Sequence, residues 1–79
     1  MKAVQVKMAR AAVGLGVREL AKRAGLTANT VTRIENGADA KQSTMDRLQQ
    51  ALEAAGVQFI DENGGGPGVR LQKRQLKKG

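Results

Sequence analysis

The stretch that decides the fold is residues 18–37, "RELAKRAGLTANTVTRIENG". Gly25 stands where a left-handed C-terminal cap ends many helices, and the hydroxyl of Thr27 is a good N-cap for a following helix. Only Leu26 lies between these two caps. The pattern therefore predicts two short helices, over about 17–24 and 28–36, joined by a tight turn. The apolar residues expected to face inward in the first of them are Leu20, Ala21 and Ala24.

Two helices joined by so short a glycine turn must cross steeply, as in a helix-turn-helix. In the second helix, Val31 and Ile34 fall on one side. The opposite side has small, hydrogen-bonding and cationic groups, which are Ala28, Asn29, Thr32, Arg33 and Asn36. Small residues let a helix enter the major groove, and Asn and Arg can read adenine and guanine edges. This face is either a DNA-reading surface or an ordinary solvated one.

Two further helices are expected around this pair. Residues 3–13 have one apolar face, interrupted by "GLG" at 14–16, and Gly16 stands at the N-cap of the next helix. Gly37 is expected to end the helix over about 28–36, and a longer helix should follow over about 41–55. Asp39 and Gln42 have capping-box spacing, which would start this helix as early as residue 40. The expected inward residues of the two helices are Val6, Ala9, Val13, Met45, Leu48, Leu52 and Ala55.

After Gly56 the apolar period becomes alternating. "VQFI" (57–60) and "VRLQ" (69–72) predict two short strands, with Val57, Phe59, Val69 and Leu71 on one face. The loop between them, "DENGGGPG", contains the turn signal Asn63-Gly64. It lacks the Gly-Lys-Ser/Thr ending of a phosphate-binding loop, so we interpret it as a hairpin connection.

Strands of about four residues are not stable alone in water. They must either pack Phe59, the chain's only aromatic residue, onto the fourth helix or pair with the same strands of a second copy. Pairing would create the two-fold symmetry that palindromic operators match. Both alternatives stay open, and Val57, Phe59, Val69 and Leu71 are the packing or dimerisation residues in either case.

The composition argues against most kinds of catalytic and metal-binding site. The 79 residues include no Cys and no His, which removes disulfides, thiolate nucleophiles and the commonest general base and metal ligand. We therefore expect no catalytic residues, no metal site and no cofactor. No apolar run approaches the roughly 18 residues of a membrane span, and no leader opens the chain, so we expect a cytoplasmic, nucleoid-associated protein with no membrane partner.

The formal net charge of +7 favours a polyanionic partner such as double-stranded DNA. Residues 1–56 carry nine Lys or Arg against five acids, and residues 57–79 carry five against two. We divide the chain into a DNA-binding domain (1–56), a strand extension (57–72) and a basic tail (73–79). The tail has too little apolar content to fold, and serves either as a phosphate-seeking arm or for solubility.

Residues 6–57 resemble the Cro/CI-type (XRE family) helix-turn-helix of phage and bacterial repressors. The matching stretches are "ARAAVGL" (9–15), "RELAKRAGLTANTVTRIENG" (18–37) and "TMDRLQQAL" (44–52). The resemblance implies a mainly α, lambda-repressor-like bundle with its third helix in the major groove, here four helices followed by a short β-hairpin or strand pair. "AAGVQFIDENGGGPGVRL" (54–71) is similar to a C-terminal extension of short bacterial or mobile-element regulators of this family.

The resemblance also implies site residues. The base-facing positions fall on Thr27, Ala28, Asn29, Thr32 and Arg33. Members often join a first-helix arginine to the glutamate that ends the third helix, and Arg10 and Glu35 match those positions. Where many relatives have a phosphate-contacting Gln, this chain has Val17, so the contact would pass to backbone N–H groups and to Arg18. The other candidates for phosphate contact are Lys7, Asn36 and Lys41.

Two functional hypotheses follow. The first is a sequence-specific transcriptional regulator, a repressor acting as a homodimer on an inverted repeat with half-sites about 34 Å apart. The second keeps the fold as a protein-interaction module, such as an antitoxin or antiactivator, that binds a protein partner. Val17 and Ala28, apolar at positions that are usually polar, favour the second hypothesis, whereas Arg33 and the positive charge favour the first.

Overall fold

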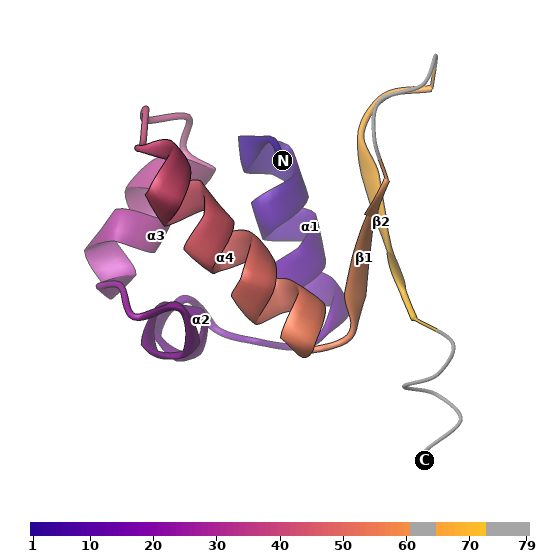
Figure 1. Cartoon of the computed structure of the whole chain (residues 1–79), viewed down its shortest axis with the longest axis horizontal. Helices are drawn as coiled ribbons and strands as arrows, with labels where there is room; N and C mark the ends of the chain where they lie inside the picture. The colour runs from indigo at the N-terminus through magenta and orange to yellow at the C-terminus, as the bar shows by residue number, and fades with distance from the viewer. Residues whose placement is uncertain (61–64, 73–79) are drawn as a thin grey trace.

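A computed structural model describes residues 1–60 and 65–72 of the chain. Four helices are followed by one antiparallel pair of strands (Figure 1). The elements are α1 (Ala3–Ala12), α2 (Val17–Ala24), α3 (Ala28–Glu35), α4 (Gln42–Ala54), β1 (Val57–Ile60) and β2 (Gly68–Leu71). The predicted fold class, a helical bundle followed by a hairpin, is confirmed. The expected turn at Asn63-Gly64 and the basic tail at 73–79 lie outside the described residues.

The turn between α2 and α3 has the predicted caps. Gly16 precedes α2 in an extended conformation, and Gly25 ends it with φ +73°. Thr27 begins α3 by accepting a hydrogen bond from the Thr30 N–H to its Oγ1 at 3.2 Å. The Gly25 conformation and the Thr27 cap bond fix where α2 ends and α3 begins. The crossing of the two helices therefore follows from interactions between residues close in sequence.

Replacement of Gly25 by alanine is expected to lower the free energy of unfolding by about 1–2 kcal/mol, since an L-residue is disfavoured by about that much in the left-handed region. The added Cβ would lie 3.7 Å from Arg47 Nη1, an ordinary contact, so the loss comes from backbone strain. Gly65→Ala is the matched control, because φ of Gly65 lies outside the left-handed region and no atom lies within 4 Å of the added Cβ. Urea denaturation of both variants checks this, and equal losses would contradict it.

The fourth helix, expected over about 41–55, is found at Gln42–Ala54, but the earlier start at residue 40 through an Asp39–Gln42 capping box was wrong. Asp39 and Gln42 do not form a capping box, because residues 38–41 stay outside the helix and Gln42 is its first residue. The Gln42 side chain instead donates from Nε2 to Asp46 Oδ1 at 2.9 Å, one turn further along. Lys41 occupies the N-cap position without a side-chain cap bond.

The core is small and draws on every helix. Its fully or nearly buried apolar residues are Val6, Ala9, Leu20, Ala21, Ala24, Val31, Ile34, Leu48, Leu52 and Val57. Val13 and Met45 are partly buried and pack against this cluster. The inward faces predicted for α2 and α3 are therefore confirmed, and α4 does support the core through Leu48 and Leu52. Small domains are only marginally stable, so each buried contact is an appreciable part of the free energy of unfolding.

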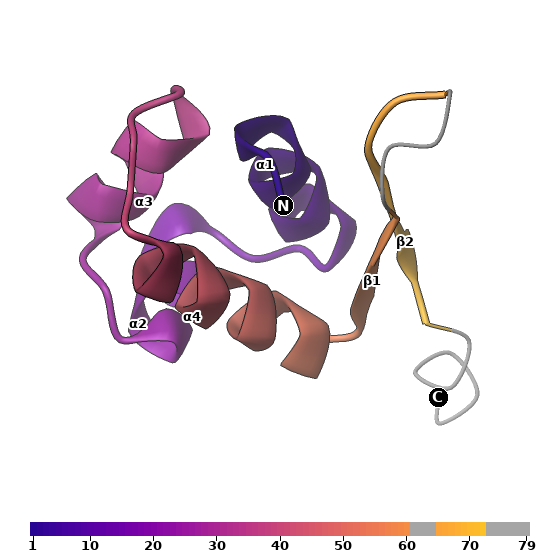
Figure 2. The same ribbon diagram turned by 45° about the horizontal axis from the view of Figure 1, so that its top comes forward.

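The hairpin packs against α1 and α4, at the end of the molecule farthest from α3 (Figures 1 and 2). Val57 lies opposite Leu71 and Phe59 opposite Val69, so these four side chains share one face of the hairpin. Val57 is fully buried, Phe59 and Val69 pack against the core, and Leu71 remains 40% exposed. Within one chain, this face is thus used for packing onto the helices.

A buried glutamine ties α1 to the hairpin. Gln5 is 4% exposed, and its Nε2 donates to the carbonyl oxygens of Ile60 at 3.2 Å and Gly68 at 3.0 Å. Its Oε1 accepts a hydrogen bond from the Lys2 N–H at 2.7 Å. An unpaired buried polar group costs free energy, so these bonds make Gln5 compatible with its site and hold both strands at the end of their ladder.

Candidate nucleic-acid interface

The outward face of α3 is a free surface at one end of the molecule (Figure 1). Val31 and Ile34 anchor the helix in the core, at 0% and 3% exposure. The predicted base-facing residues point away from them: Thr27, Asn29, Thr32 and Arg33 are exposed, and Ala28 is half-buried. This helix therefore offers small and polar groups outward while two β-branched side chains fix its position.

Two threonines fix the first turn of α3. Beyond its cap bond, Thr27 Oγ1 lies 2.9 Å from Thr30 Oγ1, within hydrogen-bonding distance. The Thr27 side chain is thus held at the helix start by both the backbone N–H and the side-chain hydroxyl of Thr30. A hydroxyl has one donor and two acceptor sites, so Thr27 keeps capacity for one further partner at the exposed surface.

Arg33 borders an open hollow of about 340 Å³ between α3, the loop at 38–41 and the start of α4. The hollow is lined by Thr30, Arg33, Ile34, Ala38, Asp39, Ala40, Lys41 and Thr44. Among the described residues, the Arg33 guanidinium makes neither a hydrogen bond nor an ion pair, so its donors are available. The lining has two cationic side chains (Arg33 and Lys41), two hydroxyls (Thr30 and Thr44) and one carboxylate (Asp39). This balance suits an anionic group such as a phosphate.

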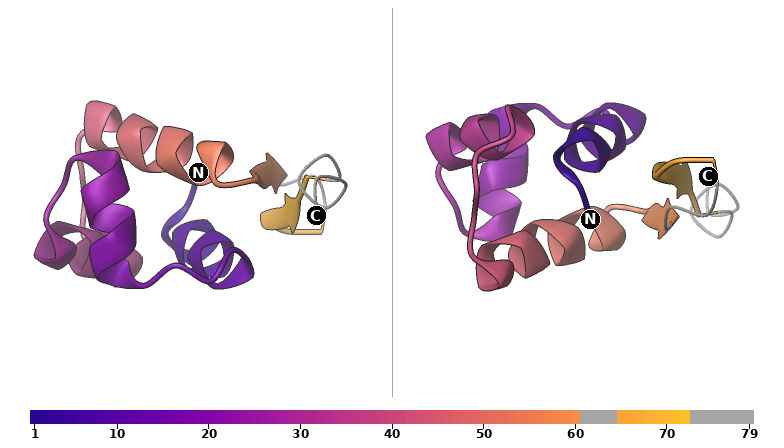
Figure 3. Two further views of the ribbon diagram at one scale, coloured as in Figure 1. Left: turned by 90° about the horizontal axis from the view of Figure 1, so that it is seen from below. Right: turned by 90° about the horizontal axis from the view of Figure 1, so that it is seen from above.

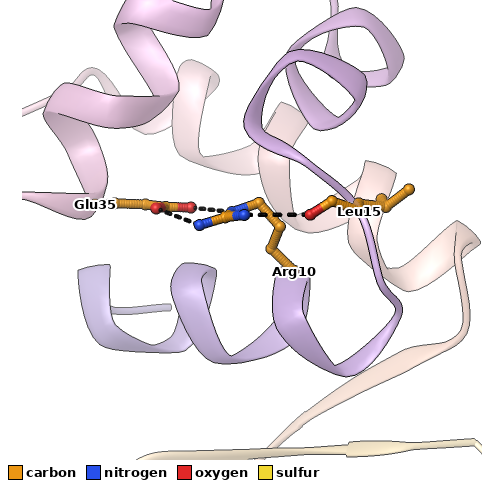
Figure 4. A network of polar contacts seen from close by, with 3 residues as sticks. All are labelled: Arg10, Leu15 and Glu35. Atoms are coloured by element: carbon orange, nitrogen blue, oxygen red, sulfur yellow. Dashed lines mark hydrogen bonds and ion pairs between the residues drawn. The ribbon is translucent and has the colours of Figure 1, made fainter.

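The ion pair expected from the resemblance joins α1 to the end of α3 (Figure 4). Arg10 donates from Nε to Glu35 Oε2 at 2.8 Å and from Nη2 to Oε1 at 3.1 Å, a two-bond geometry. Its Nη1 donates to the Leu15 carbonyl at 3.2 Å, which adds the loop between α1 and α2. Arg10 therefore links α1 to the end of α3 and to the loop between α1 and α2.

The surroundings of Arg10 favour its charged form. The hydrogen bond to Glu35 raises the pKa of the Arg10 guanidinium, and the charge of Glu35 adds to this, while burial opposes it. The Arg10 side chain is 22% exposed and that of Glu35 only 5%. The carboxylate is thus the member of the pair that depends more on its partner.

The predicted phosphate contacts are spread over several elements. Val17 packs against the core and offers no polar side chain, but α2 has no side-chain cap and the Val17 and Arg18 N–H groups find no acceptor within the described chain. Lys7 is exposed one turn before Arg10 on α1, and Asn36 is exposed at the C-cap of α3. Of these candidates only Lys41 shares the hollow with Arg33.

Sequence reasoning missed the hydroxyls of Thr30 and Thr44. Both line the hollow beside Arg33 and Lys41, although they come from different helices. Thr30 could have been found from its spacing, because it lies three residues before Arg33 on the same side of the helix. Thr44 gave no such signal, since its position depends on the path of the loop that the sequence did not define.

Two absences concern residues 1–60 and 65–72, the part of the chain that the structure describes. There, no three His, Cys, Asp or Glu residues come together in a group that could hold a metal ion. No described helix has the length and apolar character needed to span a bilayer.

Comparison with known proteins gives one family. A family model described as a helix-turn-helix domain matches residues 3–59, which spans α1 through most of β1. A search of curated proteins found no match. The matched region contains α2, the glycine turn, α3 and the Arg10–Glu35 pair. The chain therefore belongs to the helix-turn-helix domain family, and this membership supports a DNA-binding regulator.

Proposed function

We propose that the chain is a sequence-specific transcriptional regulator of the Cro/CI type, without catalytic activity, that places α3 in the major groove of double-stranded DNA. The observation that carries this proposal is the outward face of α3, where Asn29, Thr32 and Arg33 are exposed and unobstructed. A bidentate Arg prefers guanine, and Asn prefers adenine. Thr27 and Ala28 complete the base-facing set at the helix start.

Backbone contacts would orient this helix. The hollow beside Arg33, with Lys41 and the two threonine hydroxyls, supports one phosphate contact. The uncapped N–H groups at the start of α2, with Arg18, support a second. Lys7 and Asn36 are the remaining candidates. Such contacts fix register on the duplex, whereas α3 supplies the sequence information.

Repression by occlusion is the mode of action that we propose. A chain of 79 residues can block polymerase simply by occupying an operator. An eight-residue helix reads only a few base pairs, so we infer binding as a homodimer to an inverted repeat, with half-sites about one helical turn apart. DNA as partner places the protein at the nucleoid of a bacterial cytoplasm.

Selection of bound duplexes from a random pool at about 150 mM salt tests this function, since non-specific electrostatic binding is weakened by salt. We expect enrichment of an inverted repeat. Binding that is indifferent to sequence and lost with salt would contradict the proposal. It would favour the protein-interaction alternative, in which Val17 and Ala28 belong to a partner-binding surface.

A further inference from the structure

The hairpin has one strand edge that is suited to another strand. The Gln72 N–H donates to the Gly56 carbonyl at 2.9 Å, so this is a hydrogen-bonded pair of the ladder. Because such pairs alternate, the bonds inside the hairpin fall at residues 56, 58 and 60 of the first strand. The N–H and C=O groups of Val57 and Phe59 therefore point to the outer edge of β1.

This edge is open within the described chain. β1 lies beside the end of α4 and β2 lies toward α1, and no described helix or strand lies beyond the outer edge of β1 (Figure 3). The one contact there comes from Gln72 Nε2, 3.4 Å from the Val57 carbonyl, which has a second lone pair. The Phe59 backbone groups on this side have no hydrogen bond among the described residues.

We infer that two copies of the chain pair through β1, antiparallel, to form a four-stranded sheet in the order β2-β1-β1-β2. This interface deepens the proposed function, because it rests on the homodimer proposed above. The backbone fixes its register. Val57 of each copy exchanges both N–H···O bonds with Phe59 of the other, which leaves the two Gln58 side chains facing each other at a narrow, non-hydrogen-bonded pair.

Side-chain charge favours the β1 edge over the β2 edge. The sequence of β1 is Val-Gln-Phe-Ile, which has no charge and suits a strand. The outer edge of β2 exposes the groups of Val69 and Leu71, and the same symmetric pairing there would place two Arg70 side chains directly opposite each other. Like charges in that position are destabilising.

The direction of the symmetry axis also fits one DNA duplex. The two-fold axis between antiparallel strands is perpendicular to their sheet. The inner face of this sheet looks toward α1 and α4, and α3 lies beyond them at the far end of the long axis of the molecule (Figure 1). The axis therefore runs from the hairpin toward the α3 end. The α3 helices of both copies then lie on the same side of the dimer, as binding to one inverted repeat requires.

The edge also carries exposed apolar surface. Ile60 is 39% exposed on the outer face of the hairpin, next to the open edge of β1. In the pairing centred on Gln58, Ile60 lies opposite Gly56 of the second copy, which has no side chain of its own, and the Gln72 side chain that reaches the Val57 carbonyl there has to move aside. Pairing would therefore cover part of Ile60 as well as satisfy the backbone groups of the edge.

Disulfide cross-linking tests this interface on the full chain, which has no cysteine of its own. In Gln58→Cys the two thiols would face each other with Cα atoms about 4.5 Å apart, within disulfide range. Arg70→Cys is the matched control. Both residues are exposed, they lie directly opposite each other, and each variant loses the same Arg70 Nε to Gln58 Oε1 bond of 3.1 Å. In the proposed sheet the two residues 70 are three strand spacings apart, about 14 Å, which is too far for a disulfide.

We expect the unmodified chain to have twice the mass of one chain in sedimentation equilibrium. With mild oxidant at the same concentration, Gln58→Cys should cross-link about tenfold or more faster than Arg70→Cys, because thiols held together react at an effective millimolar concentration. A monomeric mass, equal rates, or faster cross-linking of Arg70→Cys would each overturn the inference. A monomer that still selects a DNA sequence would overturn the interface and the homodimer but would leave the DNA-reading role of α3 standing. A cross-linked dimer that selects no DNA sequence would support the interface and contradict the proposed function.

Discussion

Replacement of Arg33 by alanine is expected to weaken binding to the selected duplex by about 1–3 kcal/mol and to relax specificity at one base pair. This corresponds to about a 5- to 150-fold rise in Kd. The reason is geometric: Arg33 is exposed on the outward face of α3, and its donors have no partner within the described chain. Repeating the duplex selection with the variant would identify the affected base, and fluorescence anisotropy would give the change in Kd.

Arg70→Ala is the control for this prediction. It removes the same charge from an exposed arginine, but on the hairpin, at the opposite end of the molecule from α3 (Figure 1). We expect Arg70→Ala to leave the selected sequence unchanged, with only a small general loss of affinity. If both variants lost affinity equally, without change in specificity, Arg33 would act only through its charge and α3 would not be the reading surface.

Replacement of Arg10 by methionine is expected to lower the free energy of unfolding by about 2–4 kcal/mol, because a carboxylate that is nearly buried then loses its partner. Glu35 has 5% side-chain exposure and accepts two hydrogen bonds from Arg10. Glu35→Leu should cost less, about 1–2 kcal/mol, because the Arg10 side chain is 22% exposed and can reach water. Urea denaturation followed by circular dichroism measures both.

The double variant Arg10→Met/Glu35→Leu separates pairing from packing. Removal of both charges leaves no unpaired ion, and buried pairs replaced by apolar groups often retain stability. We expect the double variant to recover most of the loss caused by Arg10→Met alone. If the two single losses simply added, the bonds seen between the side chains would not be what couples α1 to α3.

The helix-turn-helix could be predicted from sequence because its determinants are local. Gly25 and Thr27 end one helix and begin the next through their own backbone conformation and one hydrogen bond, whatever the rest of the chain does. The inward positions of Val31 and Ile34 follow from helical period alone. The Asp39–Gln42 capping box was predicted from spacing alone. The structure does not form it, because residues 38–41 stay outside the helix and α4 begins only at Gln42.

Long-range contacts could not be predicted in the same way. Gln5 bonds to residues 55 and 63 positions away, and nothing in the sequence near it marks a tie to a hairpin. The hollow beside Arg33 likewise draws its lining from α3, a loop and α4. For the hairpin, sequence identified the shared face of Val57, Phe59, Val69 and Leu71 but not which surface would cover it.

The most direct test of the central claim, that α3 is the DNA-reading surface, is a nuclear magnetic resonance titration of the isotopically labelled full chain with the selected duplex. We expect the largest changes in amide shift from Thr27 to Arg33 and at Lys41, and the smallest along β2. Largest changes on the hairpin, with α3 unaffected, would contradict the account, because the outward face of α3 would then be an ordinary solvated surface.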